Sequence, residues 1–158
     1  MPPCIVLDNT VLSVFKRLDE ISLLKKIFAE NVLVPVGVEE EYLQIGEYRD
    51  LEGFNIVESE GDINYSMGKG ETQAILLARE KNCIFATDDM RARVYANKIG
   101  ITTTGTIGIL AAGVSKGILP KQKAMELLRN IQSQKLLYLS DEIFEYAMNK
   151  IKLIKINY

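Results

Sequence analysis

Acidic side chains follow two short apolar segments of this sequence that are typical of buried β-strands. Asp8 comes directly after CIVL (4–7), and the adjacent pair Asp88 and Asp89 follows CIFAT (83–87). In an open α/β sheet, the carboxyl ends of the strands form the edge at which functional groups gather. Carboxylates that converge there repel one another unless a cation lies between them. Because all-oxygen ligands favour hard ions, the pattern predicts a site for Mg²⁺ or Mn²⁺.

Two helix starts supply further carboxylates for this edge. The run EEE (39–41) lies in the helix expected after the strand at 32–35, and Glu71 opens the helix expected at Gly70. Each acid also has a structural explanation, since an Asp can cap a helix, a first-turn Glu favours the helix dipole, and a run of glutamates can be a solvated helix start. A cap needs only one of two adjacent aspartates, however. The joint position of these acids favours a functional cluster.

Three other segments are weaker indicators of function. MGKGE (67–71) matches neither the phosphate-binding loop nor the dinucleotide fingerprint, so its glycines are expected to shape the turn into a helix. Thr106 in TTTGTIG either caps a helix or orients a water or a phosphate. Arg91, Arg93 and Lys98 form a basic stretch on the helix after the aspartate pair. Such residues are by default a solvated face, and phosphate contact is expected of them only if the acids hold a metal.

The composition excludes several classes of function. The 158 residues contain no histidine, which removes Ser–His and Cys–His nucleophiles and imidazole-bound metals. The cysteines have no zinc-site spacing, and Cys4 and Cys83 are expected to be buried free thiols rather than a disulfide in a reducing cytosol. A net charge of −2 does not suggest that the whole surface binds a polyanion, although a local basic patch can.

Length and hydropathy define the class of protein. The length predicts one domain over residues 1–158, and the 47% apolar and 25% charged residues are typical of a soluble globular protein. No apolar run approaches the ~20 residues that span a bilayer. The N-terminal segment MPPCIVLD lacks the basic region and cleavage pattern of a secretion signal. We therefore expect a cytoplasmic protein that does not bind membranes.

The elements that must position these acids alternate along the chain. Strands are predicted at 4–7, 32–35, 55–58, 83–87 and 101–104, with 55–58 at an edge of the sheet. Helices are predicted from about residue 10 to 17 and at 20–30, 38–48, 70–81, 90–100, 106–116, 121–132 and 141–151. The alternation predicts an α/β sandwich, in which helices cover both faces of a mostly parallel sheet.

Four segments resemble, in order, the motifs of the PIN-domain ribonucleases, which include the VapC-type toxins of prokaryotic toxin–antitoxin pairs. These segments are IVLDNTVL, VPVGVEEEY, GKGETQAILLA and FATDDMRAR, and the acids of the family's motifs fall on Asp8, Glu41, Glu71 and Asp89. The resemblance runs from about residue 4 to 120. Its last part, ITTTGTIGILAAGVSKGILP, is similar to a branch of the family described as predicted nucleic-acid-binding proteins.

The resemblance implies a three-layer α/β/α sandwich with a five-stranded parallel sheet and a metal-dependent ribonuclease. Asp8, Glu71 and Asp89 would hold Mg²⁺ or Mn²⁺, and Glu41 would complete the cluster. Glu40 and Asp88 are the alternative acids, and Asp88 is expected to be a helix cap or an outer acid. Candidates for contact with the RNA are Asn9, Arg91, Arg93 and Thr106. The resemblance further implies single-stranded or structured RNA as the substrate, an antitoxin protein as a partner and a homodimer.

Three other interpretations compete with this one. A PIN-like module that binds RNA or a partner without cutting it would have lost acids, whereas all four motif acids are present. An aspartyl-nucleophile phosphatase needs a second Asp two positions after the first, where this chain has Thr10. A phospho-receiver domain needs a Lys after its last strand, and ITTTGT has none. The sequence therefore favours catalysis over binding alone.

Overall fold

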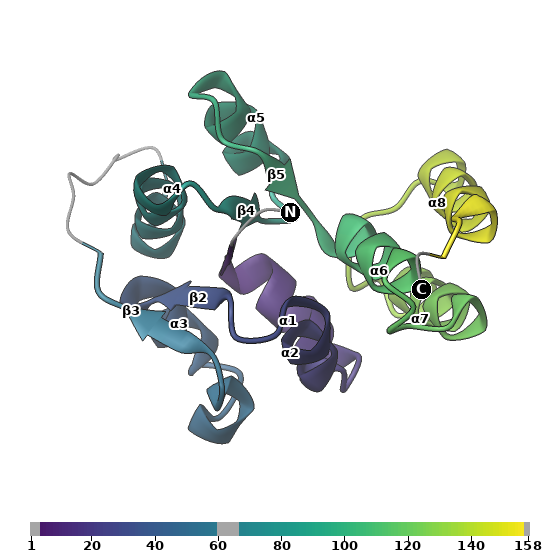
Figure 1. The fold of residues 1–158 in the computed structure, drawn as a ribbon, viewed down its shortest axis with the longest axis horizontal. Coiled ribbons are helices and arrows are strands. Elements are labelled where there is room, and N and C mark those ends of the chain that lie inside the picture. The colour runs from purple at the N-terminus through teal and green to yellow at the C-terminus, as the bar shows by residue number, and fades with distance from the viewer. Residues whose placement is uncertain (1–3, 60–66, 157–158) are drawn as a thin grey trace.

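A five-stranded parallel sheet forms the centre of the computed structural model, which describes residues 4–59 and 67–156. The strands have the order β3-β2-β1-β4-β5, and every neighbouring pair is parallel (Figure 1). They are β1 (Ile5–Leu7), β2 (Val32–Pro35), β3 (Asn55–Val57), β4 (Ile84–Ala86) and β5 (Thr103–Thr104). The predicted α/β sandwich is confirmed, and β3 lies at an edge as expected.

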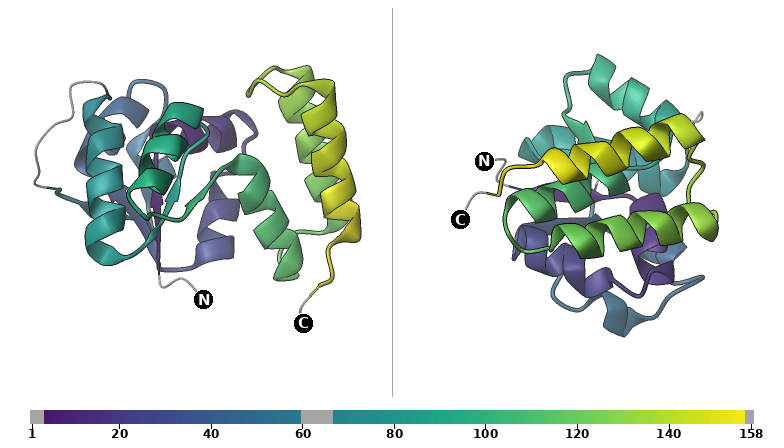
Figure 2. Two further views of the ribbon diagram at one scale, coloured as in Figure 1. Left: turned by 90° about the horizontal axis from the view of Figure 1, so that it is seen from above. Right: turned by 90° about the vertical axis from the view of Figure 1, so that its right-hand side faces the viewer.

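Helices connect successive strands and extend the chain after β5. They are α1 (Asn9–Arg17), α2 (Ile21–Phe28), α3 (Val36–Tyr42), α4 (Lys69–Lys81), α5 (Met90–Lys98), α6 (Thr106–Ser115), α7 (Lys121–Ser133) and α8 (Asp141–Leu153), with a 3₁₀ helix at Tyr48–Leu51. Figure 2 shows α7 and α8 running side by side, and both contact α6. None of the described helices is long and apolar enough to cross a membrane.

The core lies between the sheet and its covering helices. β1 is fully buried, and α4 turns Ala74, Ile75, Leu77 and Ala78 inward, as its apolar spacing predicts. This helix contacts β1, β2 and β4 and pairs with α3. The packing fixes the start of α4, which carries Glu71, beside the carboxyl ends of the central strands.

The helix predicted at 38–48 is shorter than expected. It begins directly after Pro35 and ends at Tyr42, because the following segment turns back through the 3₁₀ helix. Asp50 holds this turn: it accepts hydrogen bonds from the Tyr42 hydroxyl at 2.7 Å and the Glu47 backbone N–H at 2.9 Å. These hydrogen bonds to Asp50 hold the chain in a turn where the sequence pattern predicts a continuous helix.

The expectation of free thiols at Cys4 and Cys83 is wrong, because the two residues form a disulfide with a Cα–Cα distance of 4.8 Å. The reason is strand register. β1 pairs with β4 so that Ile5 lies opposite Ile84, which brings the preceding residues of both strands together. The disulfide therefore lies at the amino edge of the sheet, opposite the edge that carries the acids.

Candidate carboxylate active site

Asp8 is a buried carboxylate at the carboxyl end of β1. Its side chain is 1% exposed and accepts hydrogen bonds from the Asn9 N–H at 2.7 Å, the Thr87 hydroxyl at 2.7 Å and the Thr10 hydroxyl at 3.2 Å. It is also the N-cap of α1, so the structural explanation and the functional one apply to the same residue. Burial raises the pKa of Asp8 to about 6 against the lowering effect of these bonds, and the charge of Glu41 raises it further.

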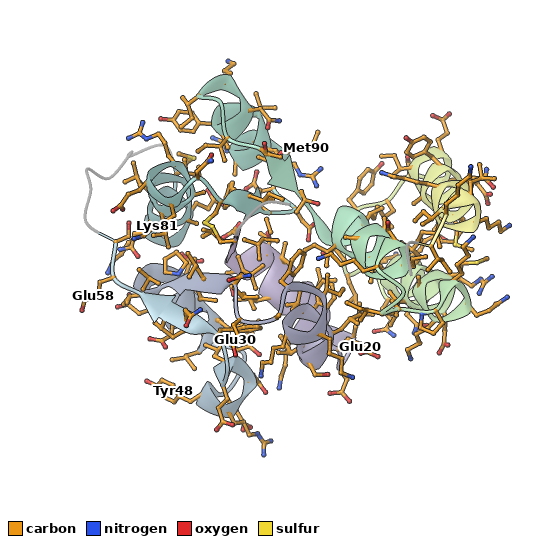
Figure 3. The ribbon with its side chains drawn as sticks, in the orientation of Figure 1. Glu20, Glu30, Tyr48, Glu58, Lys81 and Met90 are labelled. Atoms are coloured by element: carbon orange, nitrogen blue, oxygen red, sulfur yellow. A yellow bond between two sulfur atoms is a disulfide. The ribbon has the colours of Figure 1, made fainter. Side chains whose placement is uncertain are left out.

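Glu71 joins this carboxylate from the first turn of α4. Burial raises its pKa to about 7, and the charges of Asp8 and Asp89, a hydrogen bond to Asp89 and the charge of Glu41 raise it further. The four acids come from the junction of β1 and α1, from α3, from α4 and from the N-terminus of α5. The structure thus brings together all four residues that the sequence predicts for the site. Met90 in Figure 3 lies on the helix that begins at this edge, whereas Lys81 lies at the opposite end of α4.

The structure distinguishes Glu41 from Glu40. Glu41 Oε1 accepts a hydrogen bond from the Gly70 N–H at 3.2 Å, whereas Glu40 forms an exposed ion pair with Lys69 at 3.3 Å. Gly70 makes the approach of Glu41 feasible, since a Cβ atom at this position would lie 2.5 Å from Oε1. Sequence reasoning assigned Gly70 to a turn, and this is wrong: Gly68 is the N-cap of α4, and Gly70 lies inside the helix.

Asp88 and Asp89 have separate partners. Asp89 is the N-cap of α5, and its Oδ1 accepts hydrogen bonds from the Arg91 N–H at 2.8 Å and the Ala92 N–H at 3.3 Å. Of the two roles expected for Asp88, helix cap or outer acid, the cap of α5 is taken by Asp89. Asp88 instead accepts from the Thr106 N–H at 2.8 Å and the Thr106 hydroxyl at 2.6 Å, which joins the end of β4 to the start of α6. Burial raises the pKa of Asp88, while Thr106 and the Arg93 charge lower it.

Two threonines that sequence reasoning did not assign to the site hold these acids in place. Thr87 is fully buried; its hydroxyl donates to Asp8 and accepts from the Asp89 N–H at 3.1 Å. The Thr10 hydroxyl accepts from the Asp88 N–H at 2.9 Å. Thr87 could have been noticed in the sequence as a polar residue at the end of the otherwise apolar segment CIFAT (83–87). These hydroxyls fix the orientation of acids from two adjacent strands.

Comparison with known families agrees with this arrangement. A family model described as a PIN domain matches residues 4–153, which include all four acids. The chain belongs to the PIN-domain family. PIN domains are generally nucleases and typically use divalent metals, so this membership indicates a nuclease-type function. A comparison with curated proteins gave no match.

The residues predicted for substrate contact divide into two groups in this PIN domain. Asn9 is half-buried beside Asp8, and Arg91 is exposed on α5. The Arg93 Nε donates to the Thr87 carbonyl at 3.0 Å, and Thr106 is fully buried against Asp88. The contacts of Arg93 and Thr106 favour a role in supporting the acids over direct contact with a substrate.

The chemistry of the donor set fits a divalent cation. Within residues 4–59 and 67–156, no group of three or more acidic or cysteine side chains is arranged to hold a metal as it stands. Burial, and after it the charges of Asp8, Asp89 and Glu41, nevertheless raise the pKa of Glu71, because the neighbouring acids repel a negative charge on this side chain. A cation between them would remove this repulsion, and carboxylate oxygens are the ligands that Mg²⁺ and Mn²⁺ prefer.

Proposed function

We propose that this PIN-domain protein is a Mg²⁺- or Mn²⁺-dependent endoribonuclease that hydrolyses RNA phosphodiester bonds. The observation that carries the proposal is the convergence of Asp8, Glu41, Glu71 and Asp89 from four elements on one electrostatically coupled site. A purely structural role would not require four carboxylates to gather where burial, and after it the charges of neighbouring acids, raise the pKa of Asp8 and Glu71.

Each residue has a distinct role in this proposal. Asp8, Glu71 and Asp89 would hold the metal, and Glu41, fixed by its bond to the Gly70 N–H, would complete the charge of the site. The bound ion would lower the pKa of a water and neutralise charge on the scissile phosphate. Thr87 keeps Asp8 and Asp89 oriented, and Asn9 and Arg91 are the candidates for contact with the RNA.

The first experiment measures cleavage of end-labelled single-stranded RNA in Mn²⁺, Mg²⁺ or EDTA. We expect cleavage in either metal and none in EDTA, with Asp8→Asn, Glu71→Gln and Asp89→Asn each reducing the rate about 100-fold or more, since a catalytic ion is worth several kcal/mol. Glu40→Gln is the matched control, because this neighbouring acid pairs with Lys69 instead. Equal rates for all variants, or cleavage in EDTA, would contradict the proposal.

The same experiment separates the enzyme from a catalytically silent binding module. Such a module would bind RNA, leave it uncut, and keep its affinity in the Asp8→Asn variant. An antitoxin partner, a role as a toxin and homodimerisation stay predictions from the family resemblance. Co-purification with the product of a neighbouring gene and measurement of the molecular mass in solution would test them.

A further inference from the structure

A cleft of about 440 Å³ opens beside the carboxylate site and extends away from it. One wall is the exposed side of α1, and the opposite wall is the turn between α7 and α8. The cleft reaches Asp89 at its inner end, and the residues that matter here are Asn9, Ser13, Arg17, Leu137 and Tyr138. A strand bound at the carboxylates would therefore continue between these two walls.

A stripe of polar side chains runs along the α1 wall. Asn9, Ser13 and Arg17 are spaced four residues apart, so they lie on one face of the helix that Asp8 caps. The Ser13 hydroxyl donates to Asn9 Oδ1 at 3.4 Å. Arg17 is exposed, and within the described residues no carboxylate forms an ion pair with it. Its guanidinium is thus available for a phosphate at the outer end of the stripe.

The opposite wall presents an aromatic ring on a fixed turn. Leu136, Leu137 and Leu139 pack against the core, and the Leu136 N–H donates to the Ile131 carbonyl at 3.0 Å. Tyr138, between these anchored residues, is 92% exposed. An aromatic side chain held in solvent at the mouth of a cleft makes no contribution to the core. It has the geometry of a stacking platform for a base, which every nucleobase can use.

We propose that Tyr138 and Arg17 bind the substrate strand beside the scissile phosphate, with Tyr138 stacked on a base and Arg17 on a phosphate. The inference rests on the proposed nuclease function and specifies its substrate. A base that stacks on Tyr138 has to leave a duplex, so these two residues select a single-stranded or looped region. Asn9 lies between them and the acids, where it can donate to the connecting backbone.

A fluorescence experiment tests the stacking contact directly. The chain contains no tryptophan, so Tyr138→Trp introduces a single reporter. The matched control is Tyr146→Trp, because Tyr146 is also exposed but lies on α8 outside the cleft. Both are prepared with Glu71→Gln to prevent cleavage. We expect a 12-nucleotide single-stranded RNA to quench the tryptophan at 138 and not that at 146, and the same RNA in a duplex to quench neither.

The anisotropy of a labelled RNA, measured in parallel, shows whether an unquenched tryptophan reflects a lack of stacking or a lack of RNA binding. Anisotropy can show that the RNA binds while the tryptophan at 138 stays unquenched, or while both tryptophans are quenched equally. Either result would overturn the stacking proposal and leave the nuclease proposal intact. Quenching at 138 together with an absence of cleavage by the wild-type protein would support the single-strand site and overturn the nuclease proposal. Failure of the RNA to bind at all would overturn both.

Steady-state kinetics with single-stranded RNA provides the second readout. Tyr138→Ala should raise KM about tenfold with kcat within about twofold, because stacking on a base outside the reacting bond acts on binding. Tyr138→Phe keeps the ring and should restore the wild-type KM. Arg17→Gln should raise KM, and Arg129→Gln, an exposed residue of α7 outside the cleft, should not. An unchanged KM in both Tyr138→Ala and Arg17→Gln would contradict the proposal.

Discussion

At the scale of single residues, the site stores unfavourable electrostatic energy. Asp8 and Glu71 are both carboxyls whose pKa is raised by burial and by neighbouring acids, to about 6 and about 7. A raised acid pKa means that the folded protein disfavours the ionised form more than the unfolded chain does. The carboxylate cluster therefore destabilises the metal-free fold at neutral pH, which is the expected cost of a preassembled cation site.

Glu71→Gln should therefore stabilise the protein without metal, in a pH-dependent way. Below pH 4.5, the ordinary pKa of the group, Glu71 is protonated in both states and the variant should match the wild type. As the pH rises from 4.5 through about 7, the wild type loses up to about 2 kcal/mol more stability than the variant, and the difference is then constant. Urea unfolding in EDTA between pH 4 and 8 measures it, with Glu40→Gln as the control. A difference that does not change with pH would contradict this account.

Local sequence patterns specify the acids of the site only in part. Acids at strand ends and helix starts could be assigned to one edge of a parallel sheet, and the family resemblance selected Glu41 and Asp89 within their acidic runs. The choice within each adjacent pair depends on partners elsewhere in the chain. Asp88 is hydrogen-bonded by Thr106, and the absence of a side chain at Gly70 leaves space for Glu41. Neither contact follows from the local pattern around the acids.

At the scale of elements, the central strands β1 and β4 are joined twice. Thr87 and Asp8 connect them at the carboxyl edge, and the disulfide between Cys4 and Cys83 connects them at the amino edge. Local sequence patterns correctly predicted both strands as buried, but the disulfide depends on their pairing and register, which a single sequence does not specify. The same limit applies to α3, whose end is determined by Asp50.

Removal of the disulfide should lower the stability and leave the site intact. The two cysteines are 79 residues apart in sequence, for which the chain-entropy argument gives about 4.5 kcal/mol. We expect Cys4→Ala/Cys83→Ala to lower the free energy of unfolding by about 2–4 kcal/mol, and reduced wild type to behave like it. RNA cleavage per folded molecule should not change, because the bond lies at the opposite edge from the acids. Identical urea midpoints for oxidised and reduced wild type would contradict the prediction.

At the scale of the whole molecule, the α6, α7 and α8 segment extends the fold beyond the sheet (Figure 2). Its helices could be predicted from their apolar spacing. That the turn at 134–140 lies across the cleft from α1 could not, because it depends on how α7 and α8 pack on α6. Tyr138 is thus far from the acids in sequence and is brought beside them by packing, whereas Arg17 lies on the helix that Asp8 caps.

The net charge of −2 and the local placement of arginines predict a weak salt dependence of RNA binding. With Arg17 and Arg91 as the phosphate contacts, the slope of log K against log salt should lie at about −1 to −2, since each contact to a single strand contributes about −0.7. Anisotropy titrations of Glu71→Gln at several salt concentrations measure the slope. Arg17→Gln and Arg91→Gln should each reduce its magnitude by about 0.7, and Arg129→Gln should leave it unchanged. A slope that neither substitution alters would place the phosphates on another surface, because a strand that follows the cleft passes Arg17 and a strand that crosses the exposed side of α5 passes Arg91.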